Sequence, residues 1–275
     1  MCRMFAAIST ENIFPKAAHF LLDSEKSLIK QSCANPDRLQ KDGWGVGFFK
    51  SGEVRIIKSR GPIFKEEDKV RKISGEADIF LAHIREASNP KKLPHKKLIS
   101  QANSQPFSAQ GFIFCHNGTL CIPDAVSSNL GGLKKNLKGV NDSEVLFWQI
   151  IKSLNAYGDP VTAIRMSVDE IETVWISVKK EYEKKGIATP YKGLNIILAS
   201  KEALYALCLY PENSSKKAIL TPSRPFGKMA YRKEGKTFIF ASEPLDGGKW
   251  ENLENGFILS AVKSKNEITL RKEKL

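Results

Sequence analysis

The sequence predicts an α+β protein in which two long helices lie between sets of antiparallel strands. Hydrophobic residues make up 41% and charged residues 27% of the 275 residues, a composition typical of a globular chain. The long helical patterns stand together in the middle of the chain, with hairpin-like strand patterns on both sides of them. The regular alternation of strands and helices that builds a parallel sheet is absent. We therefore expect a layered sandwich and disfavour a doubly wound sheet.

The first half of the chain is expected to contain several strands and one interrupted helix. Ser51-Gly52 separates two apolar, β-rich runs and is typical of a hairpin turn. Apolar residues at helical spacing predict a helix that breaks near Ser24. Asn117-Gly118 predicts a tight turn at the end of a strand. The expected strands are 3–9, 45–50, 54–58, 79–84 and 112–116, and the expected helices are 15–32 and 68–74.

The second half is predicted to begin with two helices and to end in a meander of strands. Asn141 and Asp142 favour the start of a helix over 142–157, since Asn or Asp caps a helix and Glu144 suits its first turn. A second helix is expected over 160–185. The expected strands are 194–200, 203–210, 229–232, 237–241, 257–262 and 268–271. Because no linker or repeat marks a boundary, we expect residues 2–275 to form a single domain.

Composition argues against several other classes of protein. The longest apolar runs reach only about half of the ~18 residues that suggest a membrane span, and the N-terminus does not resemble a secretory signal, so we expect a cytoplasmic protein. Five cysteines and four histidines form no metal-ligand pattern, and we expect free thiols, no metal and no cofactor. The net charge of +13 comes from lysines spread along the chain, which argues against a nucleic-acid partner.

Cys2 is the residue whose position most strongly suggests chemistry. Removal of Met1 would leave a thiol and a free α-amine on the same residue. An α-amine has a pKa of about 7.7 to 8.0, so its neutral form can accept the thiol proton without a histidine. Cys2 would then supply both the nucleophile and the base.

Cys2 and four later segments together resemble the class II glutamine amidotransferases, a family of N-terminal nucleophile hydrolases. The segments are Lys-Asp-Gly-Trp-Gly at 41–45, Ala-His-Ile-Arg at 82–85, Asn-Ser-Gln-Pro-Phe at 103–107 continuing to His-Asn-Gly at 116–118, and Asn-Asp-Ser-Glu at 141–144. The segment 241–245 and Trp250 are similar to those of the compact, stand-alone members. The resemblance implies a four-layer αββα sandwich.

The same resemblance implies a role for each matching residue. Arg85 would bind the α-carboxylate of the substrate, as suits a guanidinium, and Asp142 would bind its α-amine. The Asn117 side chain and the Gly118 backbone N–H would form the oxyanion hole. Trp44 would be structural. Relatives often have His where this chain has Gln105, and no role is carried over to Gln105.

These residues predict a hydrolase that cleaves the side-chain amide of glutamine through a thioester on Cys2. One alternative is an amidohydrolase for γ-glutamyl peptides or conjugates, because only the leaving amine would differ. A second alternative is a catalytically silent regulatory or nucleic-acid-binding protein, which only the positive charge supports. Since no domain remains to consume ammonia, we expect a partner synthase or peptidase subunit, or a γ-glutamyl substrate larger than glutamine.

Overall fold

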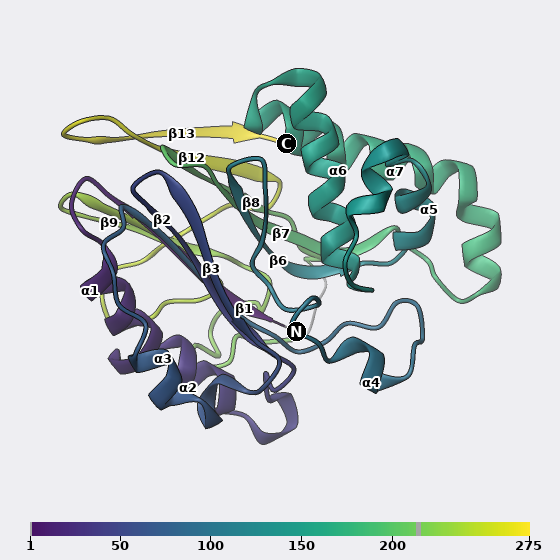
Figure 1. The fold of residues 1–275 in the computed structure, drawn as a ribbon. Helices are drawn as coiled ribbons and strands as arrows, with labels where there is room; N and C mark the ends of the chain where they lie inside the picture. The colour runs from purple at the N-terminus through teal and green to yellow at the C-terminus, as the bar shows by residue number, and fades with distance from the viewer. Residues whose placement is uncertain (1, 213–215) are drawn as a thin grey trace.

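Two antiparallel β-sheets stacked face to face form the centre of the computed structural model, which describes residues 2–212 and 216–275 (Figure 1). Within these residues, one sheet has seven strands in the order β11-β9-β10-β1-β4-β2-β3, and the other has six in the order β13-β12-β8-β7-β6-β5. The first sheet contains β1 (Arg3–Ser9), β2 (Trp44–Lys50), β3 (Glu53–Ser59), β4 (Ile79–Ile84), β9 (Ala230–Glu234), β10 (Thr237–Ala241) and β11 (Glu251–Asn252). The second contains β5 (Phe107–Ala109), β6 (Phe112–Leu120), β7 (Tyr191–Ala199), β8 (Ala203–Cys208), β12 (Phe257–Lys263) and β13 (Ile268–Lys274).

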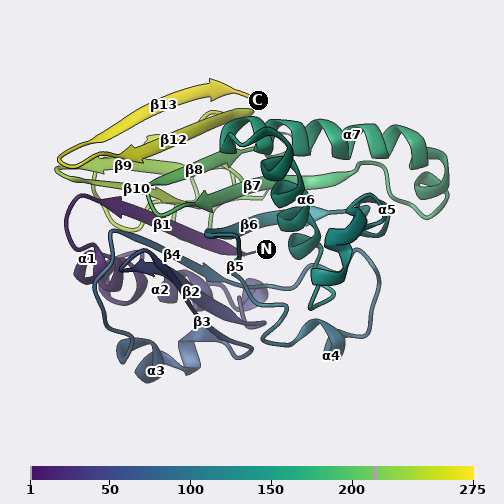
Figure 2. The same ribbon diagram turned by 45° about the horizontal axis from the view of Figure 1, so that its top comes forward.

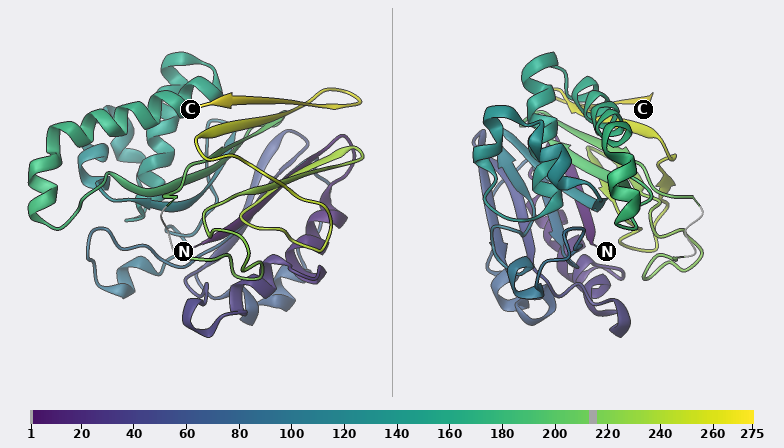
Figure 3. Two further views of the ribbon diagram at one scale, coloured as in Figure 1. Left: turned by 180° about the vertical axis from the view of Figure 1, so that it is seen from behind. Right: turned by 90° about the vertical axis from the view of Figure 1, so that its right-hand side faces the viewer.

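Helices cover the outer face of each sheet, so the order of layers is helix, sheet, sheet, helix (Figure 2). Figure 3 shows the same separation of the two helical groups from behind. The helices are α1 (Phe14–Ala18), α2 (Leu28–Cys33), α3 (Glu67–Arg71), α4 (His95–Leu98), α5 (Pro123–Ser128), α6 (Asp142–Tyr157) and α7 (Pro160–Lys184). Shorter helical segments are η1 (His19–Asp23), η2 (Pro36–Arg38), η3 (Ile63–Lys65) and η4 (Gly131–Asn136). The expected α+β class and αββα sandwich are confirmed. Among the described residues, no helix is both long enough and apolar enough to span a membrane.

Three apolar clusters hold the four layers together. One lies between α1, α2 and the first sheet and is rich in phenylalanine, with Phe5 stacked on Phe80 at 6.0 Å between ring centroids. A second fills the space between the sheets, and a third packs α6 and α7 on the second sheet. Each buried phenylalanine contributes roughly 1.5–3 kcal/mol relative to an exposed one. Because each sheet is buried on both faces, its central strands are apolar on both sides.

Local sequence signals predicted many of the elements correctly. Ser51 and Gly52 have φ angles of 51° and 80° and close the β2–β3 hairpin. The first predicted helix does break at Ser24, between η1 and α2. The expected helices 142–157 and 160–185 correspond to α6 and α7. The short elements β5, α4 and α5 were not expected.

The predicted turn at Asn117-Gly118 is wrong. Strand β6 continues through both residues to Leu120, and Asn117 pairs with Asn195 of β7. The pairing shifts register between Gly118 and Leu120. Hydrogen bonding to a neighbouring strand that lies far away in the sequence therefore overrides the local preference of Asn-Gly for a turn.

Candidate active site

Cys2 precedes β1, the central strand of the seven-stranded sheet. Side chains alternate between the two faces of a strand. Met4 points into the space between the sheets, so Cys2, two residues earlier, faces the same side. Arg3 pairs with Ile84 of β4, and one further step in this register places Cys2 opposite Arg85. The two predicted residues therefore meet at one end of the sheet.

The Cys2 thiol is buried and bonded as a neutral group. Its side chain is 8% exposed, and Sγ donates a hydrogen bond to the carbonyl oxygen of Glu86 at 3.4 Å. Burial raises the pKa of the Cys2 thiol, while the nearby Arg85 charge opposes that rise. The thiol therefore needs a base to become a nucleophile. Met1, whose removal the N-terminal mechanism requires, lies outside the described residues.

Arg85 carries a buried positive charge beside this thiol. The residue is 2% exposed, and its Nη1 donates to the carbonyl oxygens of Asp42 at 3.2 Å and Leu98 at 2.8 Å. Burial lowers the pKa of the guanidinium, but arginine remains protonated. The charges of Asp42 and Asp142 partly oppose the effect of burial on the pKa of Arg85, but within the described residues neither carboxylate lies within ion-pair distance of it. A bound carboxylate would neutralise this charge and form the hydrogen-bond geometry that guanidinium favours.

Asn117 approaches the same end of the inter-sheet space from the second sheet. Cys115, two residues earlier on β6, belongs to the inter-sheet cluster, so the alternation of the strand directs Asn117 to that side. The Asn117 side chain is buried, its Nδ2 is 3.5 Å from Ser242 Oγ, and its Oδ1 has no hydrogen-bond partner among the described residues. This long contact leaves Nδ2 available to bind a developing oxyanion.

Gly118 is a position that only glycine can occupy without movement of the strand. A Cβ there would stand 2.6 Å from the carbonyl carbon of Gly193 and from His116 Nε2, and still nearer to the Gly193 oxygen. The absence of a side chain lets β6 approach β7 closely at this point. The backbone following Asn117 is therefore packed directly against Gly193 and the His116 ring, whose Nε2 lies 3.4 Å from the Gly193 oxygen.

Asp142 connects the segment after β4 to the end of β6. Its Oδ1 accepts from Ser88 Oγ at 2.7 Å and its Oδ2 from the Leu120 N–H at 2.8 Å. The cap of α6 is Asn141, whose side chain accepts from the Ser143 N–H. Each oxygen of an ionised carboxylate has two lone pairs, so Asp142 retains capacity to accept from an amine.

The late segment 241–245 supports the start of β1. Ser242 accepts from the Met4 N–H through its Oγ at 3.1 Å and donates its own N–H to the Met4 carbonyl at 2.9 Å. Glu243 lies 3.3 Å from Arg3 in an ion pair whose side chains are both fully buried. Breaking such a pair typically costs about 3–5 kcal/mol. Sequence comparison noted this segment but gave it no role.

Asn103 and Asp42 also position the site, and sequence reasoning assigned neither. Asn103 Nδ2 donates to the Leu98 carbonyl at 3.1 Å, and its Oδ1 accepts from the Val140 N–H at 2.8 Å, just before α6. Asp42 Oδ2 accepts from the Ala87 N–H at 2.8 Å. Both lie in segments that carried the family resemblance, which was the available signal.

The other singled-out residues are structural. Trp44 is fully buried in the cluster below the first sheet and donates from Nε1 to Glu66 Oε2 at 2.6 Å, as expected. All five cysteines are free. Burial raises the pKa of Cys115, which is packed between the sheets, and of Cys121. These two thiols are therefore poor nucleophiles.

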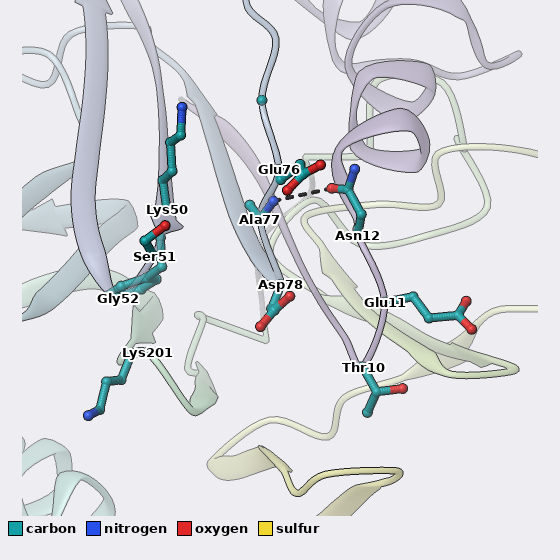
Figure 4. A pocket seen from close by; sticks show the side chains of 12 residues that line it. Thr10, Glu11, Asn12, Lys50, Ser51, Gly52, Glu76, Ala77, Asp78 and Lys201 are labelled. Atoms are coloured by element: carbon teal, nitrogen blue, oxygen red, sulfur yellow. Dashed lines mark hydrogen bonds between the residues drawn. The ribbon is translucent and has the colours of Figure 1, made fainter.

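A cavity of about 620 Å³ lies at the opposite end of β1 from Cys2, beyond Ser9 (Figure 4). Its labelled residues include Thr10, Asn12 and Lys201, and Asn12 Oδ1 accepts from the Ala77 N–H at 3.2 Å. It is separate from the predicted site. The cavity that includes Asn117 measures only about 30 Å³, room for about one water molecule. Across residues 2–212 and 216–275, no three His, Cys, Asp or Glu side chains are grouped to hold a metal ion.

Comparisons with known proteins connect this geometry to a family. The family model described as glutamine amidotransferases class-II matches residues 26–274, a range that includes Arg85, Asn117, Gly118 and Asp142 and begins after Cys2. An uncharacterized protein of Methanocaldococcus jannaschii is 26% identical over 243 residues, which cover 79% of this chain and 60% of that protein. The chain thus spans about 60% of the length of that curated relative.

Two solved structures share the fold. A glutamine aminotransferase class-II domain protein from Silicibacter pomeroyi has a TM-score of 0.63 and 18% identity, with 100% of this chain and 99% of that chain covered. The glutamine phosphoribosylpyrophosphate amidotransferase of B. subtilis has a TM-score of 0.61 and 16% identity, with 99% of this chain and 49% of that chain covered.

Proposed function

This chain belongs to the class II glutamine amidotransferases, and on that premise we propose that it hydrolyses the side-chain amide of glutamine with Cys2 as the nucleophile. The observation that carries the proposal is the meeting of three groups at one end of the inter-sheet space. These are the Cys2 thiol, the Arg85 guanidinium, which has no ion-pair partner within the described part of the chain, and Asn117 from the facing sheet. In this proposal residues 2–275 act as one amidase domain.

The proposed reaction begins when the α-amine of Cys2 removes the thiol proton, which the hydrogen bond to Glu86 otherwise retains. The thiolate attacks the amide carbon, and the carbonyl oxygen becomes an oxyanion. Asn117 Nδ2 and the Gly118 N–H donate to that oxyanion. The ammonium then returns its proton to the amide nitrogen, the C–N bond breaks and ammonia leaves. Water hydrolyses the remaining γ-glutamyl thioester, which releases glutamate and restores the thiol.

Two buried charges are proposed to hold the glutamyl group. Arg85 would bind the α-carboxylate. In support of this role, its guanidinium donates hydrogen bonds to two neutral carbonyl oxygens and to no carboxylate among the residues that the structure describes. Asp142 would bind the α-amine in addition to its contacts with Ser88 and Leu120. Arg85 follows β4 of the first sheet, and Asp142 is bonded to the end of β6 in the second sheet. The substrate would therefore extend from one sheet to the other.

The leaving amine and the partner are a second part of the proposal. Cys2, Arg85 and Asp142 are 8%, 2% and 1% exposed, so a substrate reaches them only after neighbouring segments move. We propose that a partner subunit or a larger γ-glutamyl amide favours the open state, as induced fit requires. The test compares kcat/KM on glutamine with kcat/KM on γ-glutamyl dipeptides, and repeats the glutamine assay with cell extract from the source organism. Fast glutamine turnover that neither change improves would leave a simple glutaminase.

The nucleophile is tested by intact mass and glutamate release. Cys2→Ala should abolish glutamate release and leave the circular dichroism spectrum unchanged, and Cys33→Ala, at an exposed thiol, is the matched control. An N-terminal extension that prevents exposure of the Cys2 amine should cause the same loss, since an amide nitrogen cannot act as the base. Full activity of a protein whose measured mass retains the extension would refute the N-terminal mechanism.

A further inference from the structure

Gln105 occupies a position where the six-stranded sheet lacks a backbone partner. Strand β5 pairs with β6 in a register that joins Phe107 to Phe114, and two further steps would place Gln105 opposite His116. The ladder ends before that point, and Pro106 has no N–H to donate. The Gln105 side chain forms the hydrogen bonds that a backbone partner would otherwise make. Its Oε1 accepts from the His116 N–H at 2.6 Å, and its Nε2 donates to the His116 carbonyl at 3.0 Å.

The carbonyl of His116 and the N–H of Asn117 belong to the same planar peptide unit. Gln105 therefore fixes the plane from which the Asn117 side chain projects. His83 Nε2 of the facing sheet lies 3.3 Å from the same carbonyl. Burial lowers the pKa of His83 to about 3, so the ring is neutral near pH 7 and contacts this carbonyl as an N–H donor. Two side chains thus converge on one backbone oxygen.

Apart from the pairing of the Asn117 backbone with Asn195 of β7, little else orients the Asn117 side chain. Among the described residues its amide has one hydrogen-bond contact, from Nδ2 to Ser242 Oγ at 3.5 Å, and its Oδ1 has no partner. Gln105, in contrast, is 2% exposed. Its backbone carbonyl packs so closely against Gly45 of β2 that a Cβ on Gly45 would clash with it. The tightly packed Gln105 is therefore bonded to the backbone beside Asn117, whose side chain makes few contacts.

We propose that Gln105 is a positioning residue that holds Asn117 in the geometry of the oxyanion hole by fixing the peptide unit between His116 and Asn117. The inference rests on the proposed amidase function. It assigns Gln105 an effect on the transition state and none on binding of the glutamyl group, because the hydrogen bonds of Arg85 and Asp142 among the described residues go neither to Gln105 nor to the peptide unit between His116 and Asn117.

The test is a double-mutant cycle between Gln105→Leu and Asn117→Ala, with kcat and KM measured for each protein. Gln105→Leu should lower kcat by about 10–100 fold, since displacement of a catalytic group by about 1 Å can cost about 100-fold, and KM should stay within about twofold. In the Asn117→Ala background the same substitution should lower kcat by less than about threefold, because the Asn117 side chain through which Gln105 acts is already absent.

Gln31→Leu is the matched control. Gln31 is also buried and donates to a backbone carbonyl, that of Lys26 at 2.8 Å, but it lies in α2 below the other sheet. It should leave kcat within about twofold. The rate at which iodoacetamide alkylates Cys2 should be the same in wild type and in Gln105→Leu, because the nucleophile is not altered.

Equal losses of kcat from Gln105→Leu in both backgrounds, or a loss confined to KM, would overturn the inference. If Gln105→Leu does not fold, Gln105→Glu carries the same cycle, because it retains the acceptor for the His116 N–H. Failure of the proposed function is recognised separately, since Cys2→Ala would then keep the activity of the wild type.

Discussion

Gly118→Ala tests whether the backbone beside Asn117 must stay where it is. An added Cβ would stand 2.6 Å from the Gly193 carbonyl carbon and from His116 Nε2, whereas real Cβ contacts essentially never fall below 3.0 Å. Relief of the contacts at 2.6 Å alone requires a movement of 0.4 Å, and the Gly193 carbonyl oxygen, which would be nearer still, requires a larger one. Neither neighbour yields easily, because Gly193 is backbone in a paired strand and the His116 ring is hydrogen-bonded to Ser143 at 2.9 Å.

The movement should reduce both stability and catalysis. Overpacking of this kind costs about 1–3 kcal/mol, which lowers the melting temperature by about 2–12 °C in a protein of this size. The same movement displaces the Gly118 N–H and the adjacent Asn117, both proposed oxyanion donors. Since misplacement by about 1 Å can cost about 100-fold, we expect kcat to fall by about 10–100 fold.

The assay is glutamate release at a temperature well below the melting transition, with the melting curve recorded for the same sample. Gly132→Ala is the control, because a Cβ there meets nothing within 4 Å. It should change neither the melting temperature nor kcat. A Gly118→Ala protein with the kcat of the wild type would refute the assignment of the Gly118 N–H to the oxyanion hole.

The remaining predictions separate binding from transition-state stabilisation and add a pH dependence. Arg85→Ala should chiefly raise KM, since the α-carboxylate changes little during the reaction. Asn117→Ala should lower kcat by about 100–1,000 fold, and steady-state kinetics in which both variants change only KM would contradict the oxyanion role. Burial lowers the pKa of His83 from 6.5 to about 3, so between these values the unfolded state binds more protons, and stability should fall as pH decreases from about 6.5 toward 3, by up to about 1.4 kcal/mol per pH unit. The free energy of unfolding, measured by urea titration at several pH values, should change less steeply with pH in His83→Gln than in the wild type. The same dependence on pH in both proteins would assign the effect to other groups.

Several features of this protein follow from local sequence. The hairpin at Ser51-Gly52 needs only two residues that adopt positive φ between apolar runs. Helix α6 begins where Asn141 accepts from the Ser143 N–H and ends at Gly158, which adopts φ 73°. These features were predictable because the groups that decide them lie within a few residues of one another.

The candidate site residues could also be proposed from the sequence, through the spacing of the family segments, and their roles stay predictions. The contacts that these residues make could not be predicted in this way. Arg85 could have been paired with a carboxylate, and only the assembled sheet shows that its hydrogen-bond partners are the neutral carbonyls of Asp42 and Leu98. Asp142 likewise makes contacts with Ser88 and Leu120, which no local pattern indicates.

Asn117-Gly118 and Gln105 are positions whose structure could not be predicted from the local sequence. The local preference of Asn-Gly is a turn, yet pairing with β7, whose residues lie more than 70 positions later, makes it a strand. The sequence assigns no role to Gln105, because the hydrogen bonds of its side chain depend on the register of β5 against β6 and on the end of that ladder. The sequence determined the local elements and the chemical groups of the site, because both depend on near neighbours and residue types. Tertiary structure decided which groups meet and which remain unpaired, because strand pairing and burial join residues that are distant in the chain.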